Sequence, residues 1–252
     1  MYRFLYRPKW LAFLLLGLVG AITMPILGQW QLDRYHQRQT QNKVLNNRRA
    51  EAPVPLRTLF PETAEPEKSV NFEWRPVKVT GIYDASHQVL IANRSYKGRP
   101  GYHVVTPLLI DGEQAVLINR GFVPFEANVG GPLPEAVPAT GLVTVQGIVR
   151  LSQTASSFGP SDPDKGILRE MARIDIARIA KQTPNRLVPA YLELQSETPT
   201  PAQPLSVIEQ TKQESGTNLS YAMQWFIFTA IGLITWPLII RREAAKRKRA
   251  KS

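Results

Sequence analysis

The stretch Thr217-Asn218-Leu219-Ser220-Tyr221-Ala222-Met223-Gln224-Trp225, which continues without a charged residue to Ile240, decides the architecture of this chain. As a helix rising 1.5 Å per residue, the run from Leu219 to Ile240 spans about 33 Å, and the hydrocarbon core of a bilayer is about 30 Å thick. The sequence therefore predicts a transmembrane helix over residues 218–240.

The basic segments beside the apolar runs predict the orientation. Residues 241–252 hold seven Lys or Arg against one acid, Glu243, and such short flanks stay on the cytoplasmic side. A second uncharged run, residues 10–30, follows a basic leader, residues 1–9, and lacks the small-residue cleavage site of a signal peptide. We predict two uncleaved spans in the lipid bilayer, both termini in the cytoplasm, and an extracytoplasmic domain over residues 31–217.

The first span carries its own packing signal. Gly17 and Ala21 form a small-xxx-small pair, which allows another helix to approach closely, and the second span is the expected partner. Beyond the span, the helix is predicted to continue to Asn47. Trp30 and Arg34 share one face of it, which is either a solvated face near the headgroups or a functional one, and His36 follows close to the membrane surface.

The outer turns of the second span are polar and aromatic on one face. Asn218, Tyr221 and Trp225 follow i, i+3, i+7 spacing, and Gln224 lies beside them. Tyr and Trp are also common at the membrane interface, so an aromatic belt is the alternative for those two. An amide below the interface needs a hydrogen-bond partner, so Gln224 is predicted to face protein or cofactor.

Between the spans the pattern is mostly that of strands. Asp111-Gly112 separates two apolar runs and predicts a β-hairpin. Asp175 is expected to cap a short helix over 176–182, whereas 50–68 and 195–216 are predicted to be irregular. The expected class is a membrane protein, α+β, in which two transmembrane helices flank a mostly antiparallel β domain, closed or partly closed, with a short helix. The predicted strands are 74–83, 86–94, 101–110, 114–120, 142–151 and 187–194, the first and fifth side by side because both contain Val-x-Gly-Ile.

Composition excludes several classes of function. Of the formal charge of +11, the leader carries +3 and the tail +6, which leaves 11 − 9 = +2 for the rest, so a nucleic-acid partner is not expected. The chain has no cysteine, and its three histidines lack metal-ligand spacing, which argues against a copper or zinc carrier. Because the first span begins almost at once, unlike a transit peptide, a bacterial plasma membrane is the predicted location, with the mitochondrial inner membrane as the alternative.

No catalytic motif is present, and the chain is not predicted to be an enzyme. An extracytoplasmic enzyme, the less favoured alternative, would need an acid/base pair such as His103 with Asp111 or Glu113. These residues surround a tight hairpin, where we expect no pocket.

Short motifs in a fixed order give the chain a resemblance to a known family. They are Trp30-Gln31-Leu32 with Arg34, Asn93-Arg94 before Gly101 and Thr106-Pro107-Leu108, Asn119-Arg120-Gly121-Phe122-Val123-Pro124, Tyr191-Leu192-Glu193, and Leu219 to Phe226. With the two-span topology, they resemble the surfeit-locus-one (Shy-one) family of cytochrome c oxidase assembly factors over nearly the full chain.

The resemblance implies an assembly factor that helps a haem-copper oxidase acquire haem a, with oxidase subunit I and haem a synthase as partners. The family usually has a histidine, the favoured haem ligand, where this chain has Asn218, and an amide is a poor iron ligand. Tyr221 and His36 are the remaining candidate ligands, and Gln224 and Trp225 would lie on the same cofactor-binding face. The alternative is a docking or scaffold protein for a respiratory complex that binds no haem.

Overall fold

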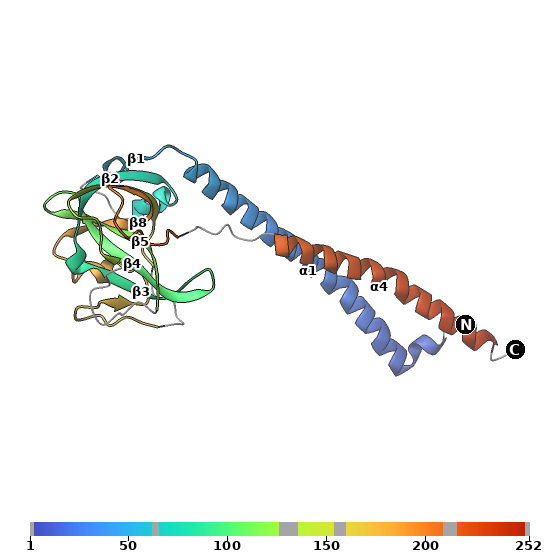
Figure 1. The fold of residues 1–252 in the computed structure, drawn as a ribbon. Coiled ribbons are helices and arrows are strands. Elements are labelled where there is room, and N and C mark those ends of the chain that lie inside the picture. The colour runs from blue at the N-terminus through green and yellow to red at the C-terminus, as the bar shows by residue number, and fades with distance from the viewer. Residues whose placement is uncertain (1–2, 62–65, 126–135, 154–159, 209–215, 250–252) are drawn as a thin grey trace. The chain divides into compact units, whose positions relative to one another are not determined.

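The computed structural model describes residues 3–61, 66–125, 136–153, 160–208 and 216–249. The chain divides into two compact units, Met1–Val44 with Thr211–Ser252, and Leu45–Gln210. Figure 1 shows that the first unit is helical and the second is built on strands. The α+β class predicted from the sequence is confirmed.

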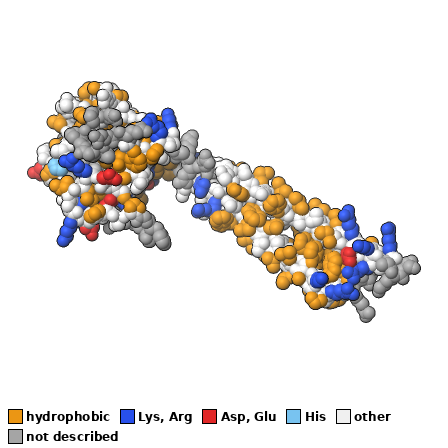
Figure 2. Space-filling view, turned by 60° about the horizontal axis from the view of Figure 1, so that its bottom comes forward, with side chains coloured by type: hydrophobic (Ala, Val, Ile, Leu, Met, Phe, Trp, Pro, Cys, Tyr) orange, Lys and Arg blue, Asp and Glu red, His pale blue; other side chains and the backbone are white. Residues whose placement is uncertain are grey.

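Two long helices make up the first unit. After a 3-10 turn, Arg3–Tyr6, α1 runs from Pro8 to Arg49, and α4 runs from Gly216 to Arg249. Both are long and apolar enough to cross a membrane. Figure 2 shows hydrophobic side chains over this unit, with Lys and Arg gathered near its end. Each helix extends beyond the predicted span. It can do so because a helix satisfies its own backbone hydrogen bonds both in lipid and in water.

Two glycines of α1 set the contact between the helices. A Cβ on Gly17 would lie 2.4 Å from the Trp236 indole, and one on Gly28 would lie 2.9 Å from the Phe226 ring. The Trp236 ring also stacks on Phe13 with 4.3 Å between ring centroids. The prediction that the small residues of the first span meet the second span is confirmed at Gly17.

Five strands of the second unit close into a barrel. They are β2 (Pro76–Tyr83), β4 (Arg99–Leu109), β5 (Gln114–Pro124), β6 (Leu142–Arg150) and β8 (Arg186–Thr198). The order is β2-β6-β8-β5-β4, and the pairing of Ile82 with Leu109 joins β4 back to β2. Only β5 and β8 run parallel within this ring. The predicted β2–β6 neighbourhood is confirmed.

Shorter elements extend the sheet on either side. β3 (Val89–Tyr96) pairs with β4, and β7 (Glu170–Met171) pairs with β3. β1 (Val54–Pro55) pairs with β2. The helical pieces are α2 (Leu56–Leu59), α3 (Ile176–Ala180) and 3-10 turns at Pro66–Phe72 and Ala85–His87.

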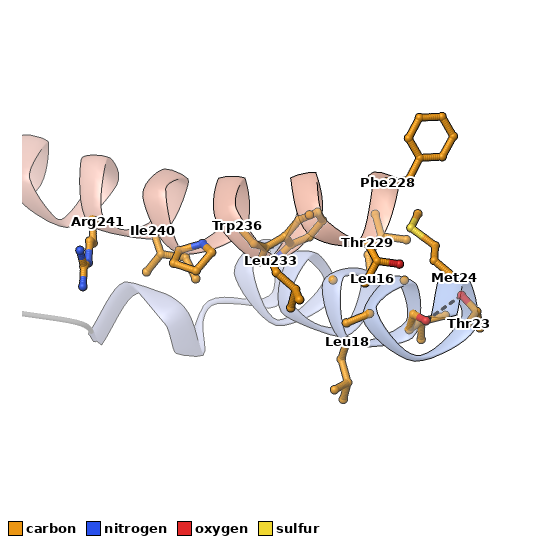
Figure 3. A pocket seen from close by; sticks show the side chains of 16 residues that line it. Leu16, Leu18, Thr23, Met24, Phe228, Thr229, Leu233, Trp236, Ile240 and Arg241 are labelled. Carbon is orange, nitrogen blue, oxygen red and sulfur yellow. Dashed lines mark hydrogen bonds between the residues drawn. The ribbon is translucent and has the colours of Figure 1, made fainter. Parts of the chain in front are cut away.

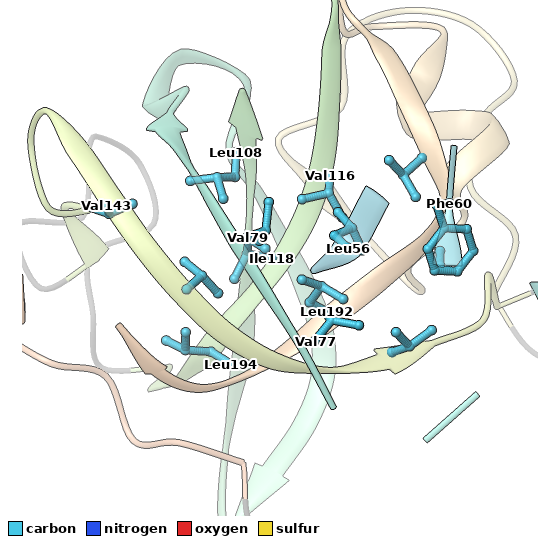
Figure 4. Packing of buried hydrophobic residues seen from close by; sticks show 14 of the residues in the cluster. Leu56, Phe60, Val77, Val79, Leu108, Val116, Ile118, Val143, Leu192 and Leu194 are labelled. Atoms are coloured by element: carbon cyan, nitrogen blue, oxygen red, sulfur yellow. The ribbon is translucent and has the colours of Figure 1, made fainter. Parts of the chain in front are cut away.

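Apolar side chains from alternate strand positions fill the barrel. Figure 4 shows Val79, Leu108, Ile118 and Leu192 meeting from different strands. A second cluster, which includes Val105, Leu117, Met171 and Ile179, lies where β3, β7 and α3 cover the other face of the sheet. Two packed layers on one sheet explain why the successive β5 residues before Pro124 are all buried.

The local predictions succeed or fail for identifiable reasons. The Asp111-Gly112 hairpin is confirmed, with Gln114 N–H donating to the Asp111 carboxylate at 2.9 Å. The Asp175 cap is also confirmed, but α3 is shorter than predicted. The irregular connector at 50–68 is wrong in part, because it contains β1 and α2 and places Leu56 and Phe60 in the core.

The polar linker predicted at 195–216 is also wrong in part. β8 continues to Thr198 through a register shift opposite β6, and its polar residues Gln195 and Ser196 are both exposed. Ser206 makes a bridge to Phe122. The sequence also indicates a Pro/Gly-rich loop at 128–140, and most of it lies outside the described residues.

Candidate functional site

The polar-aromatic face of α4 divides into two sides. Asn218 and Trp225 are half-buried, and Ala222 between them is 1% exposed, so these residues lie on the shielded side of the helix. Tyr221 is 51% exposed and Gln224 is exposed, so both point away from the helix pair. The spacing that grouped these residues in the sequence therefore does not gather them around one point.

Two amides on this stretch lack partners within the described part of the chain. The Asn218 Nδ2 is shielded from solvent and makes no hydrogen bond. Gln224 makes no hydrogen bond either, but its side chain is accessible from outside the helix pair. An unsatisfied amide in an apolar environment costs several kcal/mol, about 2–7 depending on the reference state, so an external partner for Gln224 is strongly favoured.

On α1, the candidate residues are all exposed. Trp30 is 54% exposed, and the side chains of Arg34 and His36 are accessible. The Gly28–Phe226 contact fixes the antiparallel register, and eight further residues (36 − 28 = 226 − 218) bring His36 level with Asn218. His36 lies on the exposed side of α1 at this level.

The motif Asn119-Arg120-Gly121 forms a β-bulge in β5. Val104 of β4 pairs with Gly121 and Val105 pairs with Asn119, which leaves Arg120 without a counterpart. Gly121 has φ 142°, and a Cβ there would lie 2.6 Å from the Ser206 carbonyl oxygen. Bulges redirect side chains, and here the glycine lets the chain do so.

Arg120 is directed into the protein by this bulge. Its side chain is 1% exposed, Nη1 donates to the Ala136 carbonyl at 2.6 Å and Nη2 to the Val137 carbonyl at 3.2 Å. The guanidinium carbon lies 5.2 Å from the Tyr83 ring centroid, and Tyr83 donates to Glu197 at 2.7 Å. Burial and the neighbouring Glu197 carboxylate raise the pKa of Tyr83. The cluster holds charge without exposing it to a ligand.

Asn119 belongs to a second polar group. Its Nδ2 lies 3.4 Å from His103 Nδ1, and its Oδ1 is buried without a partner. Burial and the Arg94 charge lower the pKa of His103 to about 4, so the imidazole is neutral at physiological pH. Arg94 donates to the Gln153 side chain at 3.1 Å and to the Ala172 carbonyl at 3.2 Å. These contacts join β3 to the layer that covers it.

The remaining motif residues of the barrel also make buried contacts. Tyr191 Oη accepts from Gln153 at 3.3 Å, and burial raises the pKa of Tyr191 to about 12. Glu193 pairs with Arg150 at 3.2 Å, and the Arg150 guanidinium lies 3.6 Å from the Trp74 ring centroid. The motifs of the β domain therefore serve its internal polar contacts.

The acid/base pair of the enzyme alternative is not assembled. His103 contacts Asn119, whereas Asp111 pairs with Arg57 near the hairpin turn. The six residue steps from His103 to Leu109 already span roughly 20 Å in a strand at about 3.3 Å per residue. A cavity of about 310 Å³ adjoins Asp111 and Glu113, contrary to our expectation, but His103 does not line it.

The comparisons with known proteins identify the family. The model of the SURF1 family matches residues 18–230, which include most of α1, the first turns of α4 and the barrel that lies between them in the sequence. This chain belongs to the SURF1 family. An uncharacterised SURF1-like protein of Mycobacterium tuberculosis is 29% identical over 99% of this chain and 90% of its own length. Surfeit locus protein 1 of Homo sapiens is 28% identical over 83% of this chain and 71% of its own.

Sequence reasoning missed several residues of this SURF1-family structure. Tyr83 and Glu197 were not singled out, because their approach to Arg120 depends on barrel closure. Trp236 was not singled out either, although Gly17 signalled that some side chain of the second helix would approach there. An open groove between α1 and α4 had no signal in the sequence beyond that glycine.

Proposed function

We propose that this chain is a membrane-anchored assembly factor for a haem-copper (cytochrome c) oxidase, which assists the delivery or insertion of haem a into the catalytic subunit. The family match over residues 18–230 carries this proposal, because a single family model covers residues of both apolar helices and of the barrel. Relatives named Surfeit locus protein 1 in rat and human support it. The proposed role does not require the chain to catalyse a reaction.

The donor atoms of the chain do not fit a self-contained haem site. Asn218 offers an amide, a poor iron ligand, and Tyr221 and His36 are both exposed. We therefore infer that Tyr221 and His36 contribute, at most, to a haem a site that a partner completes.

The exposed face of α4 is the proposed docking surface. Gln224 and Tyr221 point away from α1, and Gln224 needs a hydrogen-bond partner in the bilayer. A transmembrane helix of oxidase subunit I or of haem a synthase would supply one. We place the chain in a bacterial plasma membrane, and we place both termini in the cytoplasm because the last turns of α4 are strongly basic.

A docking scaffold that never contacts haem is the second candidate, and Asn218 favours it. It uses the same face of α4 and the same partners. In this case Tyr221→Phe leaves oxidase haem content unchanged, whereas Gln224→Leu still weakens association.

Optical spectra and co-purification test the proposal. In cells that make haem a, the purified chain alone is expected to lack a stoichiometric Soret band and to co-purify with subunit I. Tyr221→Phe and His36→Ala should lower the haem a content of the captured subunit. A stoichiometric Soret band in the chain alone would contradict the shared site. Absence of subunit I from the purified material would contradict the role in assembly.

A further inference from the structure

The helix pair contains an open groove that the proposed docking face does not use. Its volume is about 860 Å³, and its lining includes Leu16, Met24, Leu233, Trp236, Ile240 and Arg241 (Figure 3). Ligand cavities in proteins are commonly about 300–1,000 Å³. The groove lies wholly between α1 and α4.

Small residues keep the groove open. A Cβ added to Gly232 would meet nothing within 4 Å, and one added to Gly20 would meet only the Met24 terminal methyl at 3.8 Å. Gly17, by contrast, is covered by Trp236. The helices are therefore in contact at Gly17 and leave space around Gly20 and Gly232.

The length of the groove matches one leaflet of a bilayer. On α4 its lining runs from Phe228 to Arg241, which is about 20 Å of helix. Half of a hydrocarbon core about 30 Å thick is about 15 Å. The lining stops near the level at which Phe226 meets Gly28. A transmembrane helix of a partner would cross both leaflets and extend beyond the groove. The acyl chain of a lipid crosses only one leaflet, so its length fits the groove.

The charge at one end favours an anionic occupant. Arg241 is the first residue of the basic run, and its side chain extends from α4 toward the side on which α1 lies (Figure 3). Within the described part of the chain, Arg241 has no acidic partner, since Glu243 pairs with Arg247 at 2.6 Å. Basic sites between helices at this depth suit lipid headgroups.

We propose that the groove binds one anionic phospholipid, with an acyl chain along Leu233 and Trp236 and the headgroup phosphate on Arg241. This inference does not depend on the oxidase or on haem. The lipid would fill the space between α1 and α4 and hold the two helices at a fixed separation.

Lipid retention by the full-length protein tests the proposal. The protein is reconstituted in nanodiscs of phosphatidylcholine with or without phosphatidylglycerol, extracted into mild detergent, and analysed by native mass spectrometry. We expect about one phosphatidylglycerol per chain and no comparable retention of phosphatidylcholine. Equal retention of the two lipids would overturn the headgroup assignment.

Matched variants locate the lipid. Gly232→Leu places a leucine side chain in the groove, whereas Ala230→Leu places the same side chain at an exposed position that does not line it. Arg241→Gln should reduce retention about fivefold, equivalent to about 1 kcal/mol for one basic residue at an anionic surface, and Lys248→Gln removes the same charge away from the groove. The site is supported if phosphatidylglycerol retention falls with Gly232→Leu and Arg241→Gln and not with their controls. It is overturned if either variant retains as much phosphatidylglycerol as its control.

Discussion

The Arg120 guanidinium lies 5.2 Å from the Tyr83 ring centroid at the end of the barrel, with Glu197 hydrogen-bonded to the same tyrosine. A buried cation is retained there by two backbone carbonyls and a nearby carboxylate. This arrangement explains why the Asn-Arg-Gly motif coincides with a bulge, because only an extra residue in β5 directs the arginine inward.

Replacing Arg120 should destabilise the β domain. Arg120→Leu leaves the carbonyls of Ala136 and Val137 without their donor and the Tyr83–Glu197 pair without its cation, a loss of about 3 kcal/mol in the free energy of unfolding. Urea denaturation in detergent measures it. Arg169→Gln, at an exposed position, should change stability by less than about 0.5 kcal/mol, and a similar loss in both variants would refute the assignment.

Gly121 should tolerate no side chain. Gly121→Ala combines φ 142° with a clash against the Ser206 carbonyl oxygen, so we expect a loss of about 1–3 kcal/mol. Gly112→Ala in the hairpin turn is the control, because a Cβ there meets nothing within 4 Å. Thermal unfolding of the two variants should differ, and the idea is wrong if their Tm values coincide.

His103 should make stability depend on pH in acid. Its folded pKa of about 4 lies below the ordinary value of 6.5, so the unfolded chain binds the proton more tightly. The contribution is fully present above pH 6.5 and is lost as the pH falls toward 4. His103→Gln should flatten this part of the stability profile. An unchanged slope between pH 6.5 and 4 would show that other groups cause it.

The contact between Gly17 and Trp236 should govern the packing of the helices. Gly17→Ala forces the indole away from a position 2.4 Å from the new Cβ, whereas Gly20→Ala has room. We expect about 1–3 kcal/mol of destabilisation for the first and little for the second. Cross-linking between cysteines introduced into α1 and α4 would report the change in separation, and equal cross-linking in both variants would count against close contact.

Gln224 should matter for association and not for folding. Gln224→Leu removes an unpartnered amide from an exposed face, so the thermal stability of the isolated protein should hold or rise. Co-purification with oxidase subunit I should fall severalfold, since about 1–2 kcal/mol is typical of an interhelical hydrogen bond in lipid. Met223→Leu, also on the exposed surface, is the control. Undiminished capture with Gln224→Leu would exclude this face.

The sequence by itself determined the local features. Uncharged runs of sufficient length predicted both long helices, Asp111-Gly112 predicted its hairpin, and Asp175 predicted the cap of α3. Each depends on residues that are neighbours along the chain, so backbone preference and side-chain periodicity are enough. The β2–β6 pairing was also predictable because the two strands carry similar elements.

Only the tertiary structure decided the features that depend on distant pairings. The parallel alignment of β5 with β8, the closure of β4 onto β2 and the burial of Arg120 require registers between segments far apart in sequence. The same holds for Gln224, whose exposed side was set by which face of α4 meets Gly17 and Gly28. Whether a polar side chain is buried or exposed depends on the packing of the whole chain, and local sequence does not specify that packing.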